Sequence, residues 1–99
     1  MASKEVVFHK EALAEYETAL GWYLTRSEPA AMAFSVEVAQ AVAAIAEAPN
    51  RWAKGQNGTR KFVLRQYPFI ISYRELQSYI QIVAVAHGSR RPGYWKPRL

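Results

Sequence analysis

The chain has 99 residues, enough for one domain with one core and too few for two, so we expect residues 1–99 to form a single domain. Hydrophobic residues make up 51% of the chain, which excludes a disordered protein. The lack of cysteine excludes disulfides and thiolate zinc sites, and two histidines far apart in the sequence make a poor metal site. We therefore expect no metal and no other cofactor.

The net charge of +5 hides an asymmetry between the two halves of the chain. Residues 1–49 carry three cations against seven glutamates, and residues 50–99 carry ten cations against Glu75 alone. The second half should attract an acidic partner, phosphates or nucleic acid, although a cationic surface that only aids solubility has the same composition. The N-terminus lacks a signal-peptide pattern, and no window approaches the roughly 18 to 20 apolar residues of a membrane span. We expect a cytoplasmic protein with no membrane partner.

The first half of the chain predicts one strand and two helices. The segment EVVFH, residues 5–9, is β-branched and aromatic, which is typical of a strand. From about Lys10 to Thr25, apolar residues recur every three or four positions with glutamates between them, and this spacing predicts an amphipathic helix. Ser27 is placed to cap a second, alanine-rich helix from about Glu28 to Ala48, which Pro49 ends.

The second half predicts three strands after the polar loop RWAKGQNG. The runs TRKFVLRQY, FIISYREL and YIQIVAVAH have short connections, which favour an antiparallel meander. In the first run Lys61, Val63 and Arg65 alternate with the residues of a buried face, so a basic face should look outward. The last run is apolar on both faces from Val83 to Ala86, which places it near the middle of the sheet.

The predicted order of elements is therefore β-α-α-β-β-β. This order is typical of an α+β fold in which two N-terminal helices pack on one face of an antiparallel sheet. The chain contains no internal repeat, low-complexity segment or linker that would divide it.

The C-terminal segment AHGSRRPGYWKPRL carries the side chains best suited to chemistry. His87 ends the last strand, where its parity puts it on the face of Val83 and Val85, and it could act as a base or only as a hydrogen-bonding group. Tyr94 is an aromatic beside cations that could stack on a nucleic-acid base. Trp95 is expected to pack back onto the domain after the turn at Pro92-Gly93.

Cations on the meander and in the C-terminal segment could converge on one surface of a small sheet. Guanidinium groups there would suit phosphate, and a solvated face with scattered cations is an equal alternative. RNA cleavage through the 2′-hydroxyl needs a base, cations and an acid, roles that His87, Arg90 and Tyr94 could fill without a metal. The chain has no aspartate and no phosphate-binding glycine loop, so most other enzyme classes are excluded. The residues expected to bind nucleic acid or another target are Lys61, Arg65, Arg91, Lys96 and Arg98.

Three segments carry a family resemblance. AVAHGSRRPGYW, with GTRKFVLRQYPFIISYREL before it and VVFHKEALAEYETALGWY near the N-terminus, resembles the RelE/ParE toxins of bacterial type II toxin-antitoxin systems. The resemblance spans nearly the whole chain and implies the α+β fold predicted above. It also implies a small cytoplasmic toxin of the plasmid-stabilisation kind, which arrests growth and is held inactive by a cognate antitoxin with an acidic or amphipathic segment.

Two mechanisms occur in the family that the chain resembles. RelE-like members cut mRNA on the ribosome, using basic residues on the sheet and a tyrosine or histidine near the C-terminus, and ParE-like members inhibit DNA gyrase. The positions that match the ribonuclease pattern are Lys61, Arg65, Arg90 and Tyr94. Val63 and Ile70 are apolar where the best-known ribonucleases are basic, so the resemblance favours a ParE-like gyrase inhibitor. The alternatives are a metal-independent, ribosome-dependent mRNA endoribonuclease and a degenerate toxin that only binds its antitoxin.

Overall fold

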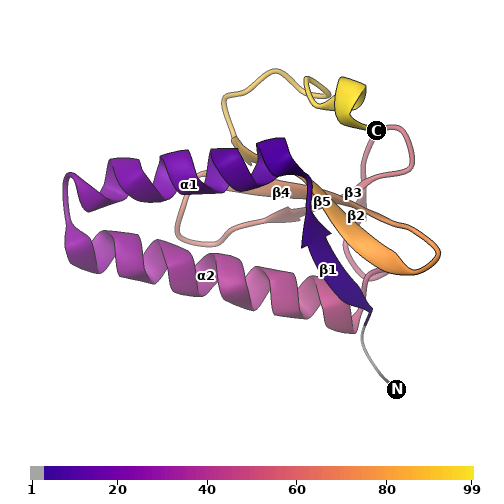
Figure 1. Ribbon diagram of the computed structural model, residues 1–99, viewed down its shortest axis with the longest axis horizontal. Coiled ribbons are helices and arrows are strands. Elements are labelled where there is room, and N and C mark those ends of the chain that lie inside the picture. The colour runs from indigo at the N-terminus through magenta and orange to yellow at the C-terminus, as the bar shows by residue number, and fades with distance from the viewer. Residues whose placement is uncertain (1–3) are drawn as a thin grey trace.

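The computed structural model describes residues 4–99, which form one sheet and two long helices (Figure 1). The strands are β1 (Glu5–Phe8), β2 (Ala53–Lys54), β3 (Arg60–Val63), β4 (Phe69–Glu75) and β5 (Tyr79–His87). The helices are α1 (Lys10–Leu24), α2 (Glu28–Glu47) and the short 3-10 helix η1 (Lys96–Arg98). The predicted α+β class and element order are confirmed, with β2 as a short additional strand.

The five strands form a mixed sheet in the order β1-β5-β4-β3-β2. Strands β3, β4 and β5 form the predicted antiparallel meander. β1 runs parallel to β5, with Val6 opposite Ile80, so the sheet is not wholly antiparallel as expected. The reason lies in the path of the chain: the two helices lead from β1 to β2, and the three antiparallel pairings from β2 to β5 then bring β5 into the same direction as β1. No property of the segment EVVFH itself distinguishes the two directions.

α1 and α2 run antiparallel along one face of the sheet (Figure 1). Both begin at capped residues: the Ser27 hydroxyl accepts a hydrogen bond from the Ala30 N–H, and the His9 ring does the same for Glu11. Their apolar stripes meet the sheet in a single core, in which Phe34 is fully buried. The other large buried side chains of this core are Ile45, Ile71, Tyr73, Ile80, Ile82 and Val85.

The composition of α2 contradicts our expectation that no segment is long and apolar enough to span a membrane. By length and composition alone, α2 is long and apolar enough to do so, because alanines occupy much of its outer face. In the fold, however, it buries Phe34, Val38 and Ile45 in the core, while Met32 and Val36 are exposed. Burial of one face against a sheet is the usual setting of an apolar helix in a globular domain.

A bulge in β5 changes which side chains face the helices. Ser72 of β4 pairs with Ala84 but the next residue, Tyr73, pairs with Ile82, so Val83 is an extra residue. Val83 and Ala84 therefore both turn to the helix-free face of the sheet, whereas Val85 returns to the main core. The prediction that His87 shares a face with Val83 and Val85 holds for Val85, with which His87 lines the same groove, and is wrong for Val83, because the bulge interrupts the alternation between Val83 and Val85.

The tail, residues 88–99, turns at Gly93 and folds back over the helix-free face (Figure 1). Gly93 has φ of 77°, a conformation that glycine adopts without strain. Trp95 is 7% exposed and packs on Val83 and Ala84, which confirms that it serves packing. The tail thereby covers part of the sheet that the helices do not reach.

Candidate functional site

The tail is fastened to α1 by the tail clasp, which consists of Glu15, Tyr94 and Arg98. The Arg98 guanidinium donates to both carboxylate oxygens of Glu15 at 2.8 and 3.0 Å, and the Tyr94 hydroxyl donates to Oε2 at 2.6 Å. The Val85 N–H donates to Oε1 at 2.9 Å, and Arg98 also donates to the Val83 carbonyl at 2.9 Å. One carboxylate therefore joins α1, β5 and the tail.

The clasp sets the protonation of its members. Burial raises the pKa of Glu15, but the hydrogen bonds from Arg98, Tyr94 and the Val85 N–H outweigh it, so the pKa lies below its ordinary value. Burial and the bond to Glu15 together raise the pKa of Tyr94 to about 12. The bond to Glu15 also raises the pKa of Arg98. At neutral pH the clasp is an anion held by a cation and a neutral phenol.

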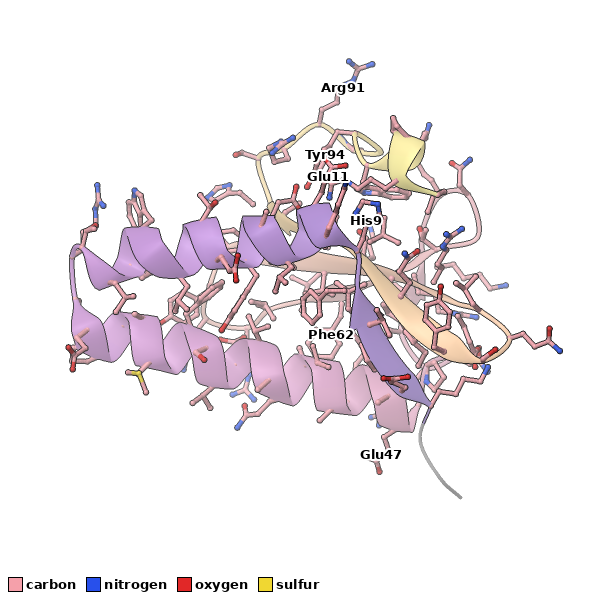
Figure 2. The ribbon with its side chains drawn as sticks, in the orientation of Figure 1. His9, Glu11, Glu47, Phe62, Arg91 and Tyr94 are labelled. Carbon is pink, nitrogen blue, oxygen red and sulfur yellow. The ribbon has the colours of Figure 1, made fainter. Side chains whose placement is uncertain are left out.

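Arg90 lies on the outer side of the clasp. Its guanidinium carbon stands 3.8 Å from the centre of the Tyr94 ring, a cation–π contact, while the side chain remains exposed. The nearby Arg91 points away from the domain, whereas Tyr94 is directed toward the start of α1 (Figure 2). Two neighbouring arginines in the sequence therefore have different surroundings, one stacked on the clasp and one in solvent.

Arg90 borders an apolar groove between α1, the end of β5 and the tail, which we call the helix-side groove. Its volume is about 630 Å³, and its walls include Trp22, Phe69 and Val85, with His87 and Arg90 at the rim. Trp22 is 52% exposed although it is the largest apolar side chain in the groove. An exposed aromatic wall of this kind is typical of a binding surface rather than of a core.

A second, smaller hollow of about 160 Å³ lies under the tail on the opposite face of the sheet, and we call it the sheet-side cavity. Lys61 of β3 lines it, with the buried Ser72 on the same side of the sheet. The remaining walls come from the β2–β3 loop and from the tail, including Arg90 and Arg91. Cations but no acid line this cavity among residues 4–99, so it is the more basic of the two hollows.

His87 stands between the two hollows and lines both. Its Nδ1 accepts the Ser89 N–H at 3.1 Å and lies 2.7 Å from the Ser89 hydroxyl. Because a nitrogen that accepts an N–H cannot carry a proton, Nδ1 is unprotonated in this arrangement. The imidazole therefore stabilises the turn after β5 through Nδ1, and Nε2 takes no part in the contact with Ser89.

Most of the predicted site residues come together in the structure, and two do not. The predicted residues that line the sheet-side cavity are Lys61, His87, Arg90, Arg91 and Tyr94, and Lys96 contacts its wall at Gly93. Arg65 lies elsewhere because β3 ends at Val63; its N–H donates to Glu37, and it borders a groove beside α2. Arg98 is held by Glu15, so its guanidinium is already paired.

The sequence did not identify Glu15 or Trp22 as part of the site. Glu15 reads as one of several solvent-facing glutamates of an amphipathic helix, and only the folded tail brings Arg98 to it, 83 residues away. Trp22 reads as a helix residue with no partner. Within residues 4–99, no group of three metal-ligating side chains lies together.

These features define a small α+β protein whose cationic C-terminal tail closes over the sheet beside a helical hairpin. The fold is similar to a solved structure titled "Chromosomal ParDE TA system from P. aeruginosa", with a TM-score of 0.73 and 19% identity, over 86% of this chain and 96% of that one. A family model described as "ParE toxin of type II toxin-antitoxin system, parDE" matches residues 6–92. The chain therefore belongs to the ParE toxin family, which confirms the resemblance found in its sequence. No curated protein matches it.

Proposed function

We propose that the protein is a toxin that arrests growth by binding and inhibiting DNA gyrase, and that a cognate antitoxin neutralises it. The observation that carries the choice of binding over RNA cleavage is the state of Tyr94. Its hydroxyl donates to Glu15, and its pKa is raised to about 12. A proton-transfer group works best with a pKa near the operating pH, so this hydroxyl is a poor acid or base for cleavage.

The helix-free face supports the same choice. Val63 is 61% exposed and Ile70 lines the sheet-side cavity, so two positions that are basic in the ribonucleases hold apolar side chains there. His87 has its Nδ1 engaged by Ser89. Two cations on this face, Lys61 and Arg91, can attract an acidic target without any proton transfer.

The helix-side groove is the surface that we assign to the antitoxin. Arg90 lines the groove and stacks on Tyr94, and Arg26, which does not itself line the groove, stacks on the wall residue Trp22 with its guanidinium carbon 3.7 Å from the ring centre. The two cations match acids on an amphipathic segment whose apolar side chains cover the groove; of the two glutamates that also line it, Glu15 is paired with Arg98 and Glu11 is exposed. A protein with a net charge of +5 favours an acidic partner for the same reason.

The test uses the purified protein, its Arg90→Ala variant and an Arg51→Ala control, in which an exposed arginine outside both hollows is removed. We expect the wild-type protein and the control to inhibit gyrase supercoiling, and Arg90→Ala to inhibit about tenfold less, the ratio that loss of one interfacial charge contact gives. None should cleave mRNA in a translating extract. Translation-dependent cleavage that disappears in Arg90→Ala would establish the ribonuclease instead. If the wild-type protein neither inhibits gyrase nor cleaves mRNA, the protein is a degenerate toxin that only binds its antitoxin.

A further inference from the structure

Arg90 is the cation that both hollows share, yet little in its own surroundings fixes it. It is exposed, and among residues 4–99 no acid lies within ion-pair distance of it. The contact that orients its guanidinium is the face of the Tyr94 ring at 3.8 Å. An exposed arginine otherwise samples many rotamers, and ordering it on binding opposes association. The position of Arg90 therefore depends on what holds the ring.

The ring is held by a residue of α1 that is 79 positions away in the sequence. The Tyr94 hydroxyl donates to Oε2 of Glu15 at 2.6 Å. Glu15 is itself fixed by Arg98 and by the Val85 N–H, which come from two other segments of the chain. A carboxylate with four donors has little freedom to turn, so it is a rigid anchor for the phenol.

We propose that Glu15 is a positioning residue for Arg90, acting through the hydroxyl and ring of Tyr94. The carboxylate contacts no target; it fixes the plane on which the arginine rests before the target arrives. The inference rests on the proposed function in one respect, that Arg90 contacts the target. It gives the clasp a role in recognition in addition to its role in holding the tail.

Glu15→Gln would also release Arg98, so the cleaner test is Tyr94→Phe, which removes one hydroxyl and keeps the ring. Tyr16→Phe is the matched control, because the Tyr16 hydroxyl donates to Ser35 at 3.1 Å on the helical hairpin, away from the tail. The first readout is the {1H}–15N NOE of the Arg90 side-chain Nε, assigned by comparison with Arg90→Lys. We expect it to fall in Tyr94→Phe and to be unchanged in Tyr16→Phe, with the tryptophan fluorescence, to which the buried Trp95 contributes, unchanged in both.

The second readout is the concentration that gives half-inhibition of gyrase. Tyr94→Phe should raise it about five- to tenfold, the ratio that corresponds to the net contribution of one hydrogen bond. In an Arg90→Ala background the same change should alter it less than twofold, because the residue through which the hydroxyl acts is gone. A merely structural role would give the same loss in both backgrounds.

Three results would overturn the positioning role. One is an Arg90 NOE that is the same in Tyr94→Phe and wild type. The second is an equal loss of inhibition with and without Arg90. The third is a lowered NOE with unchanged inhibition, which would mean that the order of the arginine does not matter to binding. If the wild-type protein fails to inhibit gyrase, the proposed target is wrong, and the NOE alone decides whether Glu15 positions Arg90.

Discussion

Replacing Glu15 with glutamine should destabilise the whole domain, because the carboxylate joins three segments of the chain. Glutamine keeps the shape of the side chain but has one acceptor oxygen in place of two, and no charge. Arg98 would then keep its positive charge in a site where only 11% of its side chain is exposed. The variant leaves a largely buried cation without its partner, which costs more than the pair contributes.

The magnitude follows from burial and from the number of bonds. Removing one partner of a fully buried ion pair costs about 3 to 5 kcal/mol, and a hydrogen bond to a charged group contributes about 1.5 to 3 kcal/mol. The Glu15 and Arg98 side chains are 18% and 11% exposed, near the buried limit but still reached by solvent. We therefore expect a loss of about 2 to 4 kcal/mol in the free energy of unfolding. For a domain of this size, that loss lowers the Tm by roughly 10 to 25 °C.

The assay is urea denaturation followed by far-UV circular dichroism and by tryptophan fluorescence, since Trp95 reports on the tail. Glu17→Gln, on the exposed side of the same helix, is the matched control and should change the free energy of unfolding by less than about 0.5 kcal/mol. An equally small change in Glu15→Gln would refute the reasoning. In the Arg98→Met background, Glu15→Gln should cost much less, because no cation is left unpaired.

Four further predictions concern pH and glycine. Because the pKa of Glu15 is lowered in the folded state, the clasp should stabilise the protein at pH values above 4.5, the ordinary pKa of a glutamate, and this contribution should be lost as the pH falls below 4.5. Urea midpoints measured at each pH would show this loss, which should be smaller in Glu15→Gln. Tyr94 should ionise near pH 12 by absorbance at 295 nm, and because this pKa is raised, its stabilisation should hold below pH 10 and be lost as the pH rises toward 12. Gly93→Ala should cost about 1 to 3 kcal/mol in urea, because φ is 77° and the new Cβ would lie 2.9 Å from neighbouring side-chain atoms. Gly21→Ala, within α1 and with open space around it, should instead stabilise by about 0.5 to 1 kcal/mol.

Local patterns of the sequence predicted the helices and β5 well. The apolar period and the caps placed α1 and α2 within about a residue of their ends, and β5 begins and ends where its run of apolar residues does. These features depend on interactions between residues close together in the sequence, so the local sequence pattern is enough to predict them. The tail turn at Gly93 and the burial of Trp95 belong to the same group.

The features that escaped prediction depend on distant contacts. Strand alternation predicted that Arg65 continues β3, but the Glu37 carboxylate accepts the N–H groups of Arg65 and Gln66 and the chain turns there instead. The extra residue Val83 depends on how β5 pairs with β4, which its own apolar run does not reveal. Glu15 was overlooked because its partners lie at the other end of the chain.

The position of the clasp has a consequence for self-association. β1 ends at Phe8, so the edge of β5 beyond Ile82 lacks a neighbouring strand on that side. Arg98 binds the Val83 carbonyl there, and Glu15 binds the Val85 N–H. Backbone groups left free on a sheet edge can pair with a strand of another molecule, which leads to aggregation. A variant that lacks the clasp would therefore be expected not only to unfold more easily but also to aggregate while still folded.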